Sequence, residues 1–372
     1  MINFASFLSE GVTPHNCAAT PSSMTDLRAE IIVFQILTRV PAKDVGRSKT
    51  VCKEWCALLS TRYFESIHSS RSFVAANQRT LMIRNLTCGV HTINFQNGEY
   101  GPETHITCPF HDDITYIFIL SQLDGLLCAW AQDTHQLFLW NPTTTTYKNL
   151  STTDGLGLYI ESTDTLGLYK DTLHDYKIVH VTRNTNALES HIYSRKLASW
   201  RKIPFQANVE YVQRSFFWSS GTQCGTSVYF TVCESWTSGK HVVIAFDIVS
   251  EQVTELRFPS VQAAPISMSH LVAVRDALYM FVTTGLHDMT LNLWLLRGKN
   301  WINVFSRPST PLSLWCGITH YMTNGNWFVM TNLGKLCEIR TPMERLECFH
   351  SVTWFRNHVG AVFHETVVSP SI

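Results

Sequence analysis

Residues that could bind a metal or transfer protons are numerous in this chain but scattered along it. The 372 residues include 16 histidines and 11 cysteines. The densest group consists of His105, Cys108 and His111, with Asp112 and Asp113 directly after it. Metal sites need three or four converging ligands, often as paired Cys-x2-Cys or His-x3-His spacings. This group has no matching second half, so we interpret it as loop residues and expect no metal and no cofactor.

Patterns of nucleophilic catalysis and of nucleotide binding are also missing from the sequence. No Gly-x-Ser-x-Gly elbow, P-loop or dinucleotide-binding glycine pattern occurs. Cys52 and Cys56 are one helical turn apart and could form a redox pair, but their setting in an amphipathic helix favours packing. We therefore expect a protein without catalytic residues.

Composition points to a globular protein of the cell interior. Lys plus Arg and Asp plus Glu both number 29, and this zero net charge argues against nucleic-acid or membrane-surface partners. No apolar run reaches the roughly 18 residues that a membrane span needs, and no secretory leader opens the sequence. The cysteines form no Cys-x-x-Cys pair. We expect free thiols in a reducing compartment, the cytoplasm or the nucleus.

The first elements expected to position functional residues are three short helices over residues 24–70. Apolar residues fit one face of a first helix at Leu27, Ile31, Ile32, Leu37 and Val40, and this helix ends where Pro41 begins a new segment. A second helix follows with Asp44 in its first turn, and a third covers Val51–Leu59. A unit of this size rarely has enough core to fold alone. We interpret it as a docking module.

The spacing of these residues resembles the F-box. The resemblance is carried by Ile36-Leu37-Thr38-Arg39-Val40-Pro41-Ala42-Lys43, Arg47 and Val51-Cys52-Lys53-Glu54-Trp55. The chain departs from the family pattern at Arg28, Gly46 and Ser48, where proline, leucine and a bulky residue are usual. The resemblance implies docking onto the Skp1-like adaptor of an SCF-type cullin–RING ubiquitin ligase, and through that adaptor onto a cullin.

The resemblance also implies which side chains meet the adaptor. They are the apolar residues of the three helices: Leu27, Ile31, Ile32, Ile36, Leu37, Val40, Pro41, Val45, Val51, Cys52, Trp55 and Leu58. The alternative is that half of them pack inside the F-box itself, with Trp55 the first candidate.

From about residue 75 the chain changes to short apolar runs separated by turn residues, which predicts β-strands. A unit of strand, polar turn and returning strand recurs along the chain. In each unit an apolar or aromatic residue of the first strand is followed seven positions later by an apolar residue that opens the returning strand. The pairs are Trp140–Tyr147, Tyr193–Trp200, Phe246–Val253, Trp294–Trp301 and Ile339–Leu346, at spacings of 45 to 53 residues. This period is near the kelch repeat of about 50 residues and favours a β-propeller over a β-sandwich.

Residues 124–144 resemble the opening of the F-box-associated domain found in large plant families. Asp124-Gly125-Leu126-Leu127-Cys128 and Leu137-Phe138-Leu139-Trp140-Asn141-Pro142 carry this resemblance, and Glu365–Pro370 resembles the closing strand of the family. We therefore expect a multidomain protein. A flexible tail (residues 1–23) precedes a small all-α F-box of three helices (24–70) and a mainly-β, kelch-like propeller (75–370).

Together, the two resemblances imply a substrate-recognition subunit whose β-domain presents a protein target. Exposed aromatic residues often anchor interfaces, and Trp236, Trp315 and Trp327 lie near loop-type residues, so we consider them candidate target contacts. The alternative for these three is partial burial. Two other functions stay open, an enzyme or small-molecule binder that uses the centre of the propeller and a binding module whose F-box has lost adaptor docking.

Overall fold

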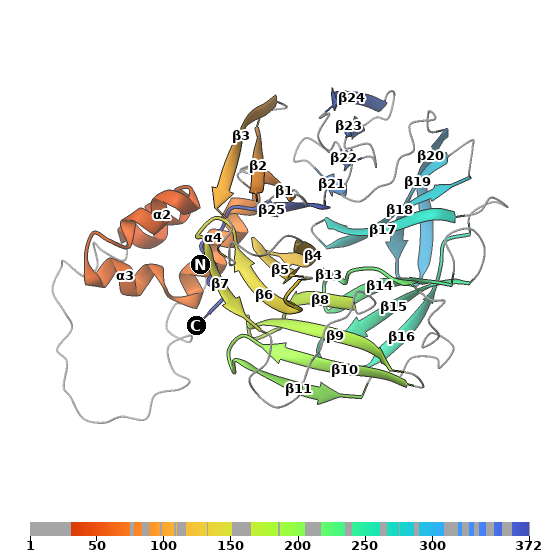
Figure 1. The fold of residues 1–372 in the computed structure, drawn as a ribbon, viewed down its shortest axis with the longest axis horizontal. Helices are drawn as coiled ribbons and strands as arrows, with labels where there is room; N and C mark the ends of the chain where they lie inside the picture. Colours follow the sequence, from red (N-terminus) through yellow and green to blue (C-terminus); the bar gives the residue numbers. More distant parts are fainter. Residues whose placement is uncertain are drawn as a thin grey trace.

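In a computed structural model of the chain, a helical module lies against one side of a ring of β-sheets (Figure 1). The structure describes residues 31–371, except 75–77, 84–88, 97–98, 108, 110–116, 132, 151–164, 185–186, 205–216, 235–239, 261–265, 275, 286–289, 309–318, 322–326, 331–334, 340–345 and 352–358. The predicted N-terminal tail and Leu27 lie outside these residues.

The helical module contains five described segments, η2 (Ile32–Ile36), η3 (Leu37–Arg39), α2 (Ala42–Ser48), α3 (Lys53–Leu59) and α4 (Arg62–Val74). The first predicted helix is irregular, since a π-helical turn passes into a 3-10 turn and then into extended Val40 (φ −83°, ψ 145°). A residue before proline avoids the helical conformation, so the chain breaks here as expected. Pro41 then caps α2, with Asp44 in its first turn.

Helix α4 is the main departure from the predicted helical pattern. We expected three helices ending at residue 70, but the structure adds a fourth, 13-residue helix that continues to Val74. The helical module therefore ends later than predicted, and the first described strand begins at Gln78.

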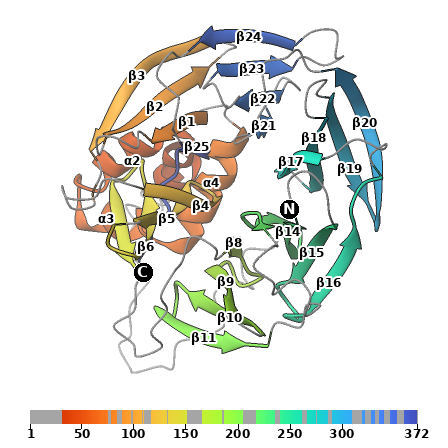
Figure 2. The same ribbon diagram turned by 45° about the vertical axis from the view of Figure 1, so that its right-hand side comes forward.

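Within the described residues the strands form six sheets arranged around a centre (Figure 2). Blade 1 contains β25 (Val359–His364), β1 (Gln78–Ile83), β2 (Gly89–Gln96) and β3 (Glu99–Thr107). Blade 2 contains β4 (Ile117–Leu123), β5 (Leu126–Ala131), β6 (Gln136–Asn141) and β7 (Thr146–Asn149), and blade 3 contains β8 (Thr165–Lys170), β9 (Tyr176–Asn184), β10 (Ala187–Ser194) and β11 (Ser199–Ile203).

The remaining three sheets complete the ring. Blade 4 contains β12 (Phe217–Trp218), β13 (Thr222–Cys224), β14 (Ser227–Cys233), β15 (His241–Asp247) and β16 (Val253–Arg257). Blade 5 contains β17 (Ile266–Val274), β18 (Ala277–Thr284), β19 (Thr290–Arg297) and β20 (Asn300–Pro308). Blade 6 contains β21 (Thr319–Tyr321), β22 (Trp327–Met330), β23 (Lys335–Ile339) and β24 (Leu346–Ser351).

The ring closes through strands that are far apart in the sequence. β25 pairs antiparallel with β1, so that Val362 lies opposite Thr80. Neighbouring blades also touch through their inner strands, because β25 contacts β4, β4 contacts β8, and β13 contacts both β8 and β17. This arrangement is a β-propeller, as the repeats predicted, and not a sandwich of two sheets. Glu365–Pro370, which resembled a closing strand, instead follows the strand that closes the ring.

The repeated units are the two outer strands of successive blades. Four of the five predicted pairs lie directly opposite each other: Trp140–Tyr147, Tyr193–Trp200, Phe246–Val253 and Ile339–Leu346. In the fifth pair, Trp301 is the second residue of the return strand β20, as Tyr147 and Trp200 are in theirs, but it lies opposite Leu296 rather than Trp294. In blade 5, Arg297 pairs with Asn300, which leaves a two-residue turn at Gly298 (φ +62°) and Lys299 that shifts the register.

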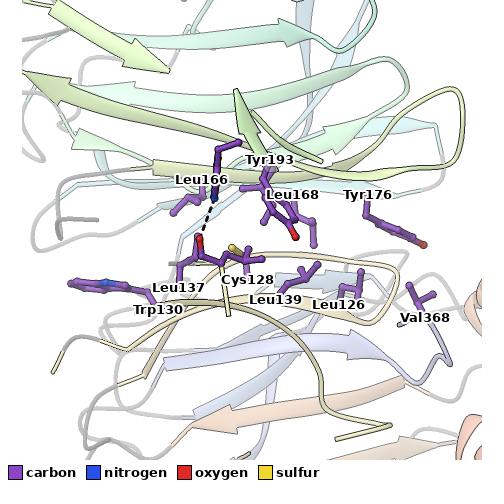
Figure 3. Close-up of a cluster of buried hydrophobic side chains, with 13 residues drawn as sticks. Leu126, Cys128, Trp130, Leu137, Leu139, Leu166, Leu168, Tyr176, Tyr193 and Val368 are labelled. Atoms are coloured by element: carbon purple, nitrogen blue, oxygen red, sulfur yellow. Dashed lines mark hydrogen bonds between the residues drawn. The ribbon is translucent and has the colours of Figure 1, made fainter. Parts of the chain in front are cut away.

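Side chains from facing sheets form the core between blades (Figure 3). In one cluster Leu126, Cys128 and Leu139 of blade 2 pack against Leu168 and Ile178 of blade 3. All six residues of β5 are buried, because successive side chains point to opposite faces and each face meets a neighbouring blade. A blade therefore buries both faces through its neighbours.

Candidate docking surface

The helical module packs around a small apolar core. Its fully buried side chains are Val33, Ala42, Val45, Leu59 and Phe64. Leu37 also belongs to this core, so two residues predicted to meet the adaptor, Leu37 and Val45, are internal. That part of the prediction was wrong, because the apolar face of so short a helix is needed to build the module itself.

Other members of the predicted set are exposed on the module surface. Ile31, Ile36 and Val51 are each more than half exposed, and Pro41 and Cys52 are exposed as well. Single exposed aliphatic side chains are common on protein surfaces, and Val249 and Ile302 of the ring are similarly exposed. Ile31, Ile36 and Val51 are candidates because they also lie in the segment predicted to dock. With Pro41 and Cys52 they are the candidate docking surface.

The rest of the predicted set lies between these two groups. Ile32, Val40, Trp55 and Leu58 are half-buried and pack against the module core. Trp55, proposed as the residue most suited to an internal role, thus keeps part of its surface in contact with solvent.

Cys52 has a local structural role that explains its place before α3. Its Sγ accepts a hydrogen bond from the Trp55 N–H at 3.4 Å, in the position of a helix N-cap. Cys56, one turn later, is exposed and is a free thiol.

Two residues of α4 hold the irregular first helix in place. The His68 Nε2–H donates to the Val40 carbonyl at 2.9 Å, and Arg71 donates to the Phe34 carbonyl and to the Thr38 hydroxyl. These contacts satisfy carbonyls that the broken helix leaves open. Burial lowers the pKa of His68, since its neutral form is favoured away from water. Neither residue was predicted from the sequence, because their partners in the first helix lie 28 to 37 positions away.

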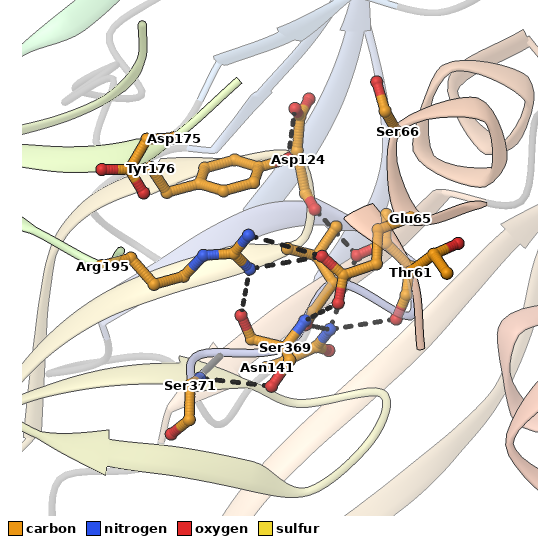
Figure 4. Close-up of polar contacts among 12 residues, drawn as sticks. Thr61, Glu65, Ser66, Asp124, Asn141, Asp175, Tyr176, Arg195, Ser369 and Ser371 are labelled. Atoms are coloured by element: carbon orange, nitrogen blue, oxygen red, sulfur yellow. Dashed lines mark hydrogen bonds and ion pairs between the residues drawn. The ribbon is translucent and has the colours of Figure 1, made fainter. Parts of the chain in front are cut away.

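A buried ion pair joins the helical module to the ring (Figure 4). Arg195, after β10 of blade 3, places Nη1 3.3 Å from the Glu65 Oε2 of α4, and both side chains are buried. Glu65 also accepts the Ser369 N–H at 3.0 Å, while Arg195 donates to the Ser369 carbonyl. The guanidinium lies over the Tyr176 ring, 4.9 Å from its centre.

The surroundings of Glu65 show the balance of forces in this pair. Burial raises the pKa of the Glu65 carboxyl above its ordinary value, against the opposing effects of Arg195 and of the Ser369 N–H. An isolated charge would be costly here, and the Arg195 guanidinium offsets part of the cost of burying the Glu65 carboxylate.

Of the three tryptophans considered as target contacts, one is described by the structure. Trp327 lies in β22, 3 % exposed, with its ring edge-on to Tyr279 and Phe281 of blade 5. The prediction that Trp327 lies on an accessible loop was wrong, because it fills the space between blades 5 and 6. Trp236 and Trp315 lie outside the described residues.

The loose metal-type group of the sequence is described only at His105, which is exposed on β3; Cys108 and His111–Asp113 lie outside the described residues. Among described residues, no three His, Cys, Asp or Glu side chains are grouped as metal ligands would be. No described helix combines the length and the apolar character that crossing a membrane requires.

Comparison with known proteins places this geometry in a family. Residues 75–325 match the F-box associated beta propeller domain. The chain belongs to the F-box-associated β-propeller family. An F-box/kelch-repeat protein of Arabidopsis thaliana is 26 % identical over 241 residues, which are 60 % of this chain and 64 % of the relative, so the match spans less than two thirds of that protein. A putative F-box protein of the same plant is 26 % identical over 282 residues, 69 % of this chain and 72 % of its own length.

Membership in this family gives the helical module its context. The relatives carry the name F-box, and here the residues that match the F-box pattern fold into helices beside an F-box-associated propeller. The exposed aliphatic residues are therefore found in the part of the chain where the F-box pattern lies.

Proposed function

We propose that this protein is the substrate-recognition subunit of an SCF-type ubiquitin ligase. Its F-box docks on a Skp1-like adaptor, and through the adaptor on a cullin, while the propeller presents a protein target. The observation that carries the proposal is the exposure of Ile31, Ile36 and Val51 on a module with the F-box pattern. Full burial of an exposed aliphatic side chain contributes about 1.5–3 kcal/mol, and these three, which are already partly covered, would each contribute part of that.

The protein supplies position rather than chemistry in this proposal. The ion pair between Glu65 and Arg195 fixes α4 to blade 3, so the target and the adaptor would be held in one orientation. Holding reactants together raises the rate of transfer without a catalytic residue on the receptor. The ubiquitin chemistry then belongs to the recruited enzyme, in the cytoplasm or the nucleus.

Coexpression with a Skp1-like adaptor followed by pull-down tests the proposal. Ile36→Asp should abolish capture of the adaptor, because a charge buried in an apolar interface costs several kcal/mol. The matched control is Ile302→Asp on the outer strand of blade 5, where the exposed fraction is 52 % against 54 % for Ile36. Leu37 is unsuitable for this test because it is part of the module core.

Val51→Asp and a matched control provide a second, independent test. Its control is Val249→Asp in the turn after β15, with 65 % exposed against 64 % for Val51. Capture of the wild type and both controls, with loss in Ile36→Asp and Val51→Asp, supports the proposal. Failure of the wild type to capture the adaptor contradicts it and favours a propeller that binds its target without an SCF complex.

A further inference from the structure

The segment Glu365–Pro370, here named the closing segment, contributes to two separate hydrophobic cores. Val367, 2 % exposed, packs in the core of the helical module with Val33, Leu37 and Phe64. Val368, 0 % exposed, packs in the cluster between blades 2 and 3. Adjacent side chains of an extended segment point to opposite sides, so one short stretch serves both cores.

Hydrogen bonds fix the closing segment to the ring. Asn141 Nδ2, at the end of β6, donates to the Thr366 carbonyl at 3.0 Å and to the Val368 carbonyl at 2.8 Å. The Thr366 hydroxyl donates to the Asp124 carbonyl at 2.7 Å. The segment is therefore held by blade 2 on the side away from the helical module.

On the other side the closing segment contacts α4. The Ser369 N–H donates to Glu65, and the Ser369 carbonyl accepts from Arg195, which itself pairs with Glu65 (Figure 4). The closing segment is therefore bonded at Ser369 to both members of the ion pair, one from the helical module and one from blade 3. Removal of the segment would leave Glu65 without one of its partners and the module core without Val367.

We propose that the closing segment couples the fold of the helical module to closure of the ring. The module is too small to bury a sufficient core alone, and Val367 completes that core from a distant part of the chain. The segment follows β25 directly, and β25 closes the ring by pairing with β1. The helical module therefore reaches its docking conformation in chains whose ring is closed, which makes docking conditional on a completed propeller.

Val367→Ala and Val368→Ala in the full chain form a matched pair that tests this coupling. Amide hydrogen exchange, measured without any adaptor, should be at least about tenfold faster in α2 and α3 of Val367→Ala than in wild type, while β5 and β8 stay protected. Val368→Ala should show the reverse. Compared with Val367→Ala, its exchange should be faster in β5 and β8 and slower in α2 and α3.

Wild-type exchange in α2 and α3 of Val367→Ala would overturn the coupling, as would a larger effect there from Val368→Ala. A chain that ends at His364 retains every described strand and lacks the closing segment. It should lose protection in α2 and α3, and in β5 and β8 because Val368 is also removed, but keep it in blades 4 and 5. Retained protection in α2 and α3 would also overturn the proposal. Because no adaptor is present, these outcomes are independent of the proposed ligase function.

Discussion

The helical module and the contact between blades 2 and 3 bury their apolar side chains in different ways. The cluster between the blades contains 13 buried described side chains, nearly all from the two sheets themselves. The module core contains seven. Each core takes one side chain from the closing segment, Val368 in the cluster between the blades and Val367 in the module, so Val367 is the larger share of its core. The comparison teaches that the propeller stabilises itself by repetition, whereas the module depends on the propeller.

Breaking the link between the two regions should have the largest effect. Arg195→Ala leaves Glu65 buried without its partner, which we expect to cost about 3–5 kcal/mol. The control is Arg201→Ala, because Arg201 also pairs with a glutamate, Glu251, but in an exposed position that is worth about 0–1 kcal/mol. Urea unfolding of both variants measures the difference, and equal losses would contradict a structural role for the buried pair.

A double variant sharpens the same comparison. In Glu65→Leu/Arg195→Met both charges are replaced by apolar side chains, so neither is left uncompensated. We expect this variant to recover most of the stability that Arg195→Ala loses. If the double variant is as unstable as the single one, then the hydrogen bonds to Ser369, rather than the paired charges, hold the regions together.

Replacing a glycine of the ring by alanine should destabilise the protein, whereas the same change in the module should stabilise it. A Cβ on Gly221 would lie 2.6 Å from the Cα of Gly167 and 2.6 Å from the Phe230 ring, where blades 3 and 4 meet. Gly221→Ala should therefore destabilise the protein by about 1–3 kcal/mol through overpacking. Thermal unfolding checks this, and a wild-type melting temperature would show that the blades have room to separate.

Acid should weaken the module through His68. Because the folded-state pKa of His68 is lowered, the unfolded chain takes up the proton first, and stability is lost as the pH falls below about 6.5. Amide exchange in α4 at about pH 7.5 and about pH 5.5 measures this effect. His68→Gln keeps a donor for the Val40 carbonyl and cannot titrate, so it should remove most of the pH dependence; unchanged dependence would assign it to other groups.

The smallest expected effect is at Gly46 in α2. A Cβ there would meet no atom within 4 Å, so Gly46→Ala should stabilise the module by about 0.5–1 kcal/mol through helix propensity alone. Slower exchange in α2 would confirm the gain, while faster exchange would mean that the glycine relieves strain in the helix.

Repetition explains why much of the ring could be predicted from the sequence. Pairs such as Tyr193–Trp200 recur because several blades repeat the same hairpin. In this hairpin a four-residue connection between the strands fixes the register. The cross-strand pairing differs at Trp294–Trp301, where the turn at Gly298 shortens the connection to two residues. Local turn chemistry, not apolar spacing, decides the register there.

The link between the regions left no comparable signal in the sequence. Glu65 and Arg195 are 130 residues apart, and Val367 lies about 300 positions from the core that it completes. No periodicity connects such residues, because their contact depends on how the closed ring presents the closing segment. The exposure of the module's apolar residues could be predicted only in part, for a related reason. Spacing identifies the apolar residues of a short helix but does not separate Ile36, which is exposed, from Leu37, which is buried.

The most direct test of the central claim is the affinity of the full chain for a Skp1-like adaptor, measured by calorimetry for Ile36→Asp and Ile302→Asp. The two isoleucines have nearly equal exposure, 54 % and 52 %, and differ in the region where they lie. We predict that Ile36→Asp binds at least about 100-fold more weakly than wild type, since burying the charge costs several kcal/mol, and that Ile302→Asp binds as wild type does. Equal affinities in the two variants would contradict adaptor docking through this surface.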